Sequence, residues 1–226
     1  MKIGVLLSGC GVYDGAEIQE AVFSLLAIEE AGAEAVCLSV NKNQHHVVNH
    51  LTGEEMTESR NMMVEATRIA RGSVKDIHNY NISQLDAVVI PGGFGSAKNF
   101  TSWAFDGPNG TVLPEIQEFI KKCISDKKPI AALCVSPVVL ALALQHSDVH
   151  PTMTLGTDQE KSPYDISAFS GGLTQTGVQA EMKTNREISV DHNLKIVSAP
   201  CYMMDATVLE IRNNIQQAIK ALIELI

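Results

Sequence analysis

The chain has 226 residues, of which 45% are hydrophobic and 19% are charged. This is the composition of a globular protein with a buried core, and it excludes extended disorder. The formal net charge of −9, with no cluster of Lys and Arg, disfavours binding to phosphate backbones or anionic membranes. We therefore expect neither nucleic acid nor a membrane among the partners.

The apolar run at residues 1–9 is too short for a signal peptide, and the longest one, residues 130–144, is too short to cross a bilayer. The cysteines number five and form no CxxC pair, which argues against a disulfide framework and a structural zinc site. We expect a cytoplasmic protein. Three of the cysteines lie on apolar patterns typical of a core: Cys37, Cys123 and Cys201.

Strand and helix patterns alternate from the N-terminus onward. Short apolar runs predict strands at residues 3–7, 35–40, 86–90, 129–133 and 152–155. Helical spacing of apolar residues, with Ile18, Val22, Leu25 and Leu26 as the first such face, predicts helices at residues 17–31, 57–70, 112–125 and 137–145. A hairpin at residues 187–190 and 195–198 and a helix from about Thr207 complete the chain.

The strands contain almost no polar residues, which indicates a parallel sheet covered on both faces. Alternating strands and helices predict an α/β, doubly wound fold. Because no linker or internal repeat divides the sequence, we expect one domain over residues 1–226. Residues 162–179, rich in Ser, Gly, Thr and Gln, predict a mobile loop or insertion.

Ligands of open parallel sheets bind beyond the carboxyl ends of the strands. Cys134 lies at such an end, with Ser136 as a candidate N-cap and Pro137 as the first helical residue. The small side chains of Ala132 and Ser136 allow a sharp strand–cysteine–helix turn. Free helix N–H groups there would lower the thiol pKa and make Cys134 reactive. A buried structural cysteine is the alternative, and the local pattern leaves both open.

Two other strand ends carry unusual residues. The N–H groups of Gly92, Gly93 and Gly95 either line an oxyanion site or belong to a tight turn that needs positive φ. No Gly-Lys-Ser/Thr follows, which excludes a phosphate loop. Glu17 follows the first strand. By itself its position is typical of a surface carboxylate at a helix start, although it could also reach Cys134.

Four histidines are weaker candidates. His45, His46 and His50 are clustered, but without a carboxylate or cysteine scaffold they are typical of a surface, and we expect no metal. His192 lies in the predicted hairpin turn and could act as a base only if the hairpin folded over the site.

Several motifs together point to a known family. Residues 8–18, Ser-Gly-Cys-Gly-Val-Tyr-Asp-Gly-Ala-Glu-Ile, resemble the opening of the isoprenoid-biosynthesis glyoxalases, also called enhancing-lycopene-biosynthesis (ElbB) proteins. These belong to the ThiJ/PfpI class I glutamine amidotransferase-like superfamily. Further similarity is found at residues 49–54, 58–61, 91–99, 155–158 and 200–203, so that it covers nearly the whole chain.

The resemblance implies a flavodoxin-like fold, a homodimer, a nucleophilic Cys134 and Glu17 as its acidic partner. It implies glutathione-independent conversion of small 2-oxoaldehydes to 2-hydroxy acids through a Cys134 hemithioacetal, with Glu17 moving the proton and no cofactor. We expect the oxyanion and substrate contacts at the same edge of the sheet, from Gly92, Gly93, Gly95, Val135, Cys10, Gly11 and Asn99.

Some features depart from related hydrolases. Val135 follows Cys134 and no His-Pro-Glu motif is found near the C-terminus, so a Cys–His–Glu triad is not expected and glutamine amide hydrolysis is disfavoured. Cys10 is a rival or companion thiol. The main alternative to an enzyme is a redox or carbonyl-stress sensor built on Cys134, or an accessory protein of isoprenoid metabolism.

Overall fold

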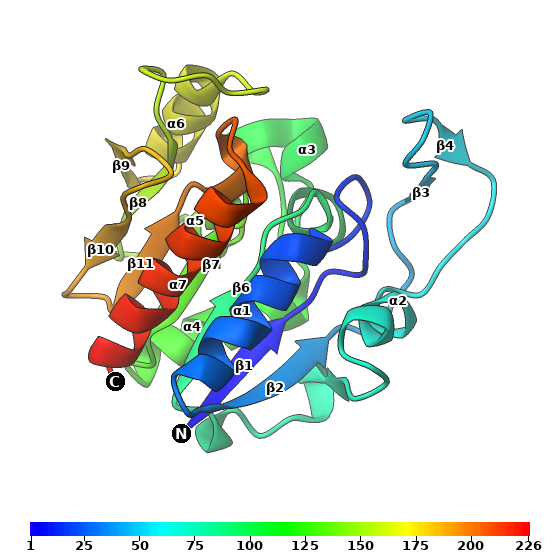
Figure 1. Cartoon of the computed structure of the whole chain (residues 1–226), viewed down its shortest axis with the longest axis horizontal. Coiled ribbons are helices and arrows are strands. Elements are labelled where there is room, and N and C mark those ends of the chain that lie inside the picture. The colour runs from blue at the N-terminus through cyan, green and yellow to red at the C-terminus, as the bar shows by residue number, and fades with distance from the viewer.

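A central sheet of seven strands organises the molecule, as the computed structural model of residues 1–226 shows (Figure 1). Six of the strands are parallel to one another, and the seventh, β10 (Ser189–Asp191) at one edge of the sheet, is antiparallel to its neighbour. The fold is therefore the predicted doubly wound, flavodoxin-like one. The strands across the sheet are β5 (Lys75–Asp76), β2 (Glu34–Ser39), β1 (Lys2–Leu6), β6 (Ala87–Ile90), β7 (Ile130–Leu133), β11 (Ile196–Ala199) and β10 (Ser189–Asp191).

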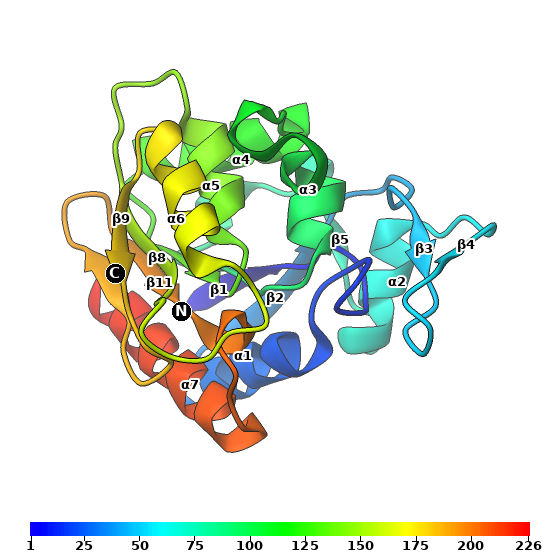
Figure 2. The same cartoon turned by 90° about the horizontal axis from the view of Figure 1, so that it is seen from above.

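Helices cover both faces of this sheet (Figure 2). One face carries α1 (Ile18–Glu30) and α7 (Val208–Glu224), and the other carries α4 (Pro114–Ser125) and α5 (Pro137–Leu144). Every residue of α5 is buried, which explains why its sequence is apolar all round. The helix α7 begins with a capping box between Thr207 and Glu210. No helix is both long and apolar enough to span a bilayer.

The prediction of a mobile loop at residues 162–179 was wrong. This segment contains α6 (Ile166–Gln175), which contacts a second, parallel strand pair, β8 (Thr152–Gly156) and β9 (Gln179–Met182). Asp165 caps the helix by accepting the Ala168 N–H at 2.9 Å. Gly172 lies against Trp103 of α3 (Trp103–Asp106), since a Cβ there would come within 2.9 Å of the ring. The cap and the packing stabilise a helix whose composition is a weak helix former.

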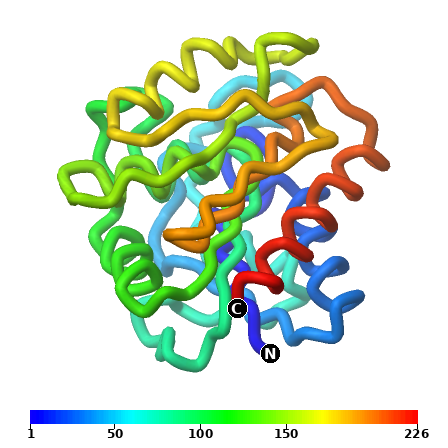
Figure 3. Tube along the Cα trace, turned by 90° about the vertical axis from the view of Figure 1, so that its left-hand side faces the viewer, coloured from blue at the N-terminus to red at the C-terminus, as the bar shows by residue number.

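A small hairpin of β3 (Val47–Val48) and β4 (Glu55–Met56) projects from the β2 side of the molecule (Figure 1). The helix predicted over residues 57–70 is shorter, because α2 (Met62–Ile69) begins only after Asn61, whose side chain accepts the Val64 N–H. The two chain termini lie together at the amino end of the sheet (Figure 3). The strands end on the opposite side of the molecule, and loops cover their carboxyl ends.

Asn99 ties three of these loops together. Its Nδ2 donates to the carbonyl oxygens of Ser8 and Asp14 at 2.9 and 2.8 Å, and its Oδ1 accepts the His45 N–H at 2.8 Å. Only 7% of the residue is exposed. All the hydrogen bonds of this amide are thus made to backbone groups, and the expected substrate contact at Asn99 is replaced by a structural one.

Replacing Asn99 by Ala is expected to destabilise the protein by about 2–4 kcal/mol, because buried backbone groups lose their partners. For a protein of this length the melting temperature falls by several degrees. Thermal unfolding followed by circular dichroism measures the change. The matched control is Asn193→Ala, at an exposed asparagine whose side chain makes no hydrogen bond, and an equal melting temperature for Asn99→Ala and wild type would contradict the bracing role.

Candidate functional site

The chain turns sharply at Cys134, directly after β7. Its φ of +57° lies in the left-handed region, which a non-glycine residue adopts only when its surroundings enforce it. Its N–H donates to the carbonyl of Ala199 on the neighbouring strand β11 at 2.9 Å. The thiol is therefore held at the carboxyl end of the sheet, where the small flanking residues predict it, and only 6% of the residue is exposed.

The loop after β6 packs directly on this turn. A Cβ at Gly92 would lie 2.3 Å from the Cβ of Cys134, so that only glycine fits. Ser136 joins the two loops: its Oγ donates to the Pro91 carbonyl at 2.7 Å and lies 2.8 Å from the Oγ of Ser96. Ser136 thus makes no side-chain cap for α5, contrary to prediction, because its hydroxyl is used between loops.

Glu20 is the carboxyl group nearest to the thiol, and the sequence prediction missed it. It is fully buried, and one carboxyl oxygen accepts the Tyr202 N–H at 3.1 Å. Its other oxygen, Oε2, has no full hydrogen bond and faces the Cys134 thiol and the backbone of Gly92.

The face of α1 explains the omission. The predicted apolar face is largely solvent-exposed, with Ile18 at 47% and Val22 at 44%. The buried face instead consists of one acid, three small residues and one isoleucine: Glu20, Ala21, Ser24, Ala27 and Ile28. A carboxylate on a stripe of small residues was the available signal, and it was overlooked because the bulkier apolar residues stand on the opposite side.

Glu17, the predicted acidic partner, is the N-cap of α1. Its Oε2 accepts the Glu20 N–H at 2.7 Å. Burial raises the pKa of Glu17, while the N–H groups of Glu20, Gln19 and Ile18 lower it. Glu17 therefore borders the site with its carboxylate held by the helix start, while Glu20 lies against the sulfur.

Burial dominates the electrostatics of this pair. Desolvation, followed by the charge of Glu17, raises the pKa of Glu20 to about 8. Desolvation, followed by the charge of Glu20, raises the pKa of the Cys134 thiol well above its ordinary value, although the Val135 N–H lowers it. The predicted low-pKa thiolate was wrong, because removal from water outweighs the helix N-terminus. At neutral pH a thiol faces a protonated carboxyl group.

The thiol opens into a small cavity of about 20 Å³, room for about one water molecule. An open hollow of about 610 Å³ adjoins it, and the two share Val12, Glu17, Tyr164 and Tyr202, which form the partition between them. Tyr164 precedes α6 and its ring stacks edge-on against Phe94, at 5.7 Å between centroids. The small cavity is lined by Val12, Glu17, Gly93, Phe94, Cys134, Val135, Tyr164, Tyr202 and Met203.

Only part of the predicted binding set reaches this cavity. The N–H groups of Gly93 and Val135 donate to no backbone carbonyl, and both residues line the cavity beside the thiol. The N–H of Gly95 donates to the Gly15 carbonyl, and that of Gly11 donates to the Ala16 carbonyl, so neither is free to bind a ligand. Cys10, half-buried near Asp14 and Glu65, lies outside the cavity as well. Of the predicted set, two N–H groups therefore remain as oxyanion donors to a ligand of Cys134.

No histidine lines the cavity. His192 lies in the turn between β10 and β11, beside a different hollow. His46 contacts the Nζ of Lys98, and His50 lies 3.8 Å from Asp14. No three His, Cys, Asp or Glu side chains are grouped as metal ligands.

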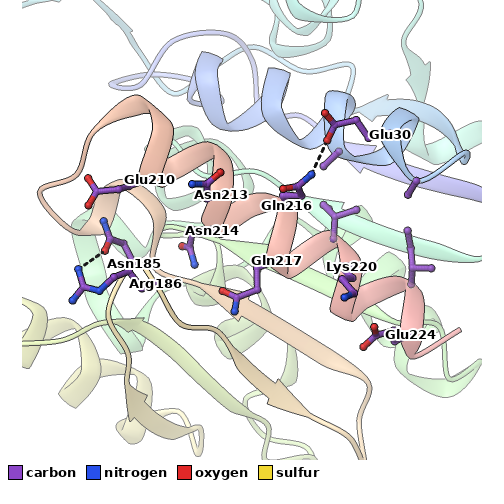
Figure 4. Close-up of a pocket in the computed structure, with 14 residues that line it drawn as sticks. Glu30, Asn185, Arg186, Glu210, Asn213, Asn214, Gln216, Gln217, Lys220 and Glu224 are labelled. Carbon is purple, nitrogen blue, oxygen red and sulfur yellow. Dashed lines mark hydrogen bonds between the residues drawn. The ribbon is translucent and has the colours of Figure 1, made fainter.

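A hollow of about 730 Å³ forms a groove between α1 and α7 (Figure 4). Its walls are mostly amides and charged groups, and Gln216 donates to Glu30 across it at 2.9 Å. It contains no cysteine or histidine. The nucleophile is thus found in the smaller cavity at the strand ends.

Curated relatives span nearly the whole chain. The ES1 protein homolog of Rattus norvegicus is 35% identical over 99% of this chain and 84% of its own length. The glutamine amidotransferase-like class 1 domain-containing protein 3 of Homo sapiens is also 35% identical, over 99% of this chain and 83% of its own. Both are named as mitochondrial, which conflicts with the cytoplasmic location predicted from the sequence and overturns that prediction.

Solved structures agree with the fold. An isoprenoid biosynthesis protein with an amidotransferase-like domain from Ehrlichia chaffeensis superposes with a TM-score of 0.90 at 34% identity, covering 100% of this chain and 99% of that one. Drosophila melanogaster DJ-1beta shares the fold alone, with a TM-score of 0.57 at 13% identity over 99% of this chain and 94% of its own. The model of the DJ-1/PfpI family matches residues 10–147. The chain belongs to the DJ-1/PfpI family.

Proposed function

We propose that the protein is a glutathione-independent glyoxalase that converts small 2-oxoaldehydes to 2-hydroxy acids. The observation that carries this proposal is the pairing of a buried Cys134 thiol with the protonated carboxyl group of Glu20, beside two unused backbone N–H groups. The name of the Ehrlichia chaffeensis neighbour and the motifs shared with isoprenoid-biosynthesis glyoxalases support a place in that branch of the family.

The first step is addition of the thiol to the aldehyde. The sulfur of Cys134 bonds to the aldehyde carbon, the protonated carboxyl group of Glu20 gives its proton to the carbonyl oxygen, and Glu20 takes the thiol proton in return, which gives a hemithioacetal. The N–H groups of Gly93 and Val135 stabilise the charge that develops on that oxygen. Because both donors belong to the backbone of tight turns, they need no rearrangement during the reaction.

The second step moves a proton between the two carbons. Glu20, in its ionised form, removes the proton from the hemithioacetal carbon and returns it to the neighbouring carbon through an enediol. This leaves a thioester. Water then releases the hydroxy acid and restores the thiol. A carboxyl pKa of about 8 suits this exchange, since Glu20 can both donate and accept a proton near neutral pH.

A 2-oxoaldehyde needs more room than the cavity beside Cys134 provides. Tyr164 and Tyr202 separate this cavity from the open hollow, so movement of one of these rings admits the substrate. The name of the human relative raises glutamine amide hydrolysis as the other possibility. That reaction in related enzymes uses a histidine base, and none lines this cavity, which favours the aldehyde reaction.

D-lactate formation from methylglyoxal without glutathione tests the proposal. Replacing Cys134 by Ser or Glu20 by Gln is expected to lower kcat/KM at least about 100-fold, because each removes a group that bonds to or exchanges protons with the substrate. Glu17→Gln is expected to have a smaller effect, since Glu17 acts on Glu20 through its charge.

The matched controls are Glu29→Gln, an exposed acid on the same helix, and Cys37→Ala, a buried cysteine elsewhere. Both should retain the wild-type rate. An inactive wild type, or Cys134→Ser and Glu20→Gln variants as active as wild type, would refute the glyoxalase assignment.

The protonated state of Glu20 predicts a pH-dependent stability. The carboxyl pKa is 4.5 in the unfolded chain and about 8 in the folded protein, so the folded state keeps a proton that the unfolded state has released. This contribution is full below pH 4.5 and is lost as the pH rises through 8, at up to about 1.4 kcal/mol per pH unit. Glu20→Gln removes it.

Urea unfolding of wild type and Glu20→Gln between pH 5 and 8 measures this effect. The free energy of unfolding of wild type, relative to the variant, should fall steadily as the pH rises. Glu29→Gln should run parallel to wild type. A constant difference between wild type and Glu20→Gln would show that Glu20 is ionised across this range.

A further inference from the structure

Cys201 lies beside Cys134 because their strands are neighbours in the sheet. The strands β7 and β11 are parallel, with Leu133 opposite Ala199. Cys134 follows the first of these residues directly, and Cys201 follows the second after one proline. Both cysteines adopt left-handed backbone conformations, with φ of +57° and +46°, so that the backbone turns directly after each of the two strands.

The two turns share one carboxyl group. Glu20 accepts the N–H of Tyr202, next to Cys201, and presents its other oxygen to the Cys134 thiol. Burial raises the pKa of the Cys201 thiol well above its ordinary value, and the nearby charge of Glu20 raises it further. Asn214 holds the second turn by accepting the Cys201 N–H at 3.0 Å. Both cysteines are buried, and the two turns that carry them meet at Glu20.

We propose that Cys134 and Cys201 form an oxidisable thiol pair, in which hydrogen peroxide oxidises Cys134 and Cys201 closes an intramolecular disulfide. The inference does not rest on the glyoxalase proposal, because it needs no aldehyde and no movement of Tyr164.

The reaction has two steps. The sulfur of Cys134 attacks one oxygen of hydrogen peroxide, the O–O bond breaks, and a sulfenic acid and a water molecule form. Glu20 takes the thiol proton and gives one to the departing hydroxide, so that it ends protonated as it began. The sulfur of Cys201 then attacks the sulfenic sulfur and releases a second water molecule. Two thiols lose two electrons in total, and the peroxide gains them.

The geometry suits both the bond and the oxidant. Leu133 and Ala199, the paired strand ends that the two cysteines follow, lie on neighbouring strands. Such strands are about 4.8 Å apart, and a disulfide spans Cα separations of about 4.4–6.8 Å. The cavity of about 20 Å³ at the sulfur admits a molecule little larger than water. Hydrogen peroxide fits this limit and bulkier organic hydroperoxides do not. A resolving thiol in the same compartment would protect Cys134 from irreversible oxidation.

Treatment of the reduced protein with one equivalent of hydrogen peroxide, followed by denaturation, alkylation and mass spectrometry, tests the pair. The wild type should become about 2 Da lighter before alkylation. Two of its five cysteines should resist alkylation, and the peptides of Cys134 and Cys201 should be linked until dithiothreitol separates them. tert-Butyl hydroperoxide at the same concentration should oxidise the pair far more slowly.

In Cys201→Ala the sulfenic acid has no partner, and a second equivalent of hydrogen peroxide, given to wild type and variant alike, should oxidise Cys134 to sulfinic acid, about 32 Da heavier. Cys123→Ala, at a buried cysteine away from the site, should form the disulfide as wild type does. The proposal fails if wild type also ends as sulfinic acid with Cys201 alkylated. It fails equally if Cys134 stays reduced or is linked to Cys10. The peptide map of the wild type alone identifies the linked cysteines, so the test holds even if Cys201→Ala does not fold.

Discussion

The burial of one carboxyl group against one thiol is the interaction on which the rest of the site depends. Glu20 and Cys134 are far apart in the sequence. Glu20 lies on α1 and Cys134 directly follows β7, and the two meet at the carboxyl ends of the parallel strands. Because water is excluded, each group favours the neutral form of the other. Glu20 thus keeps a proton at neutral pH that an exposed carboxyl group would release.

The surrounding turns are built to preserve this contact. Gly92 leaves room for the sulfur and the carboxyl oxygen, and Ser136 fastens the loop after β6 to the loop after β7. The N–H of Tyr202 fixes the carboxyl group of Glu20 from the third side. Three turns from distant parts of the chain are thereby locked, and Gly93 and Val135, whose N–H groups bond to no backbone carbonyl, line the same cavity.

The same enclosure sets the limits of the chemistry. A small oxidant reaches the thiol directly, while an aldehyde must first displace the tyrosine partition. The segment that carries Tyr164 leads into α6, which is anchored on Trp103 through Gly172. The two proposed reactions therefore differ in one physical requirement, the opening of this partition, although they use the same sulfur and the same acid.

The sequence by itself determined the doubly wound sheet, because buried parallel strands are continuous apolar runs and their helices alternate with them. It also determined the turn at Cys134, since small residues, an N-terminal proline and a preceding strand are local signals. The tertiary structure alone decided which acid meets the thiol: α1 turns its small residues and Glu20 inward and leaves Ile18 and Val22 outside. It also decided the thiol pKa, because desolvation depends on every element that packs around Cys134, and it placed Cys201 beside it through the pairing of β7 with β11.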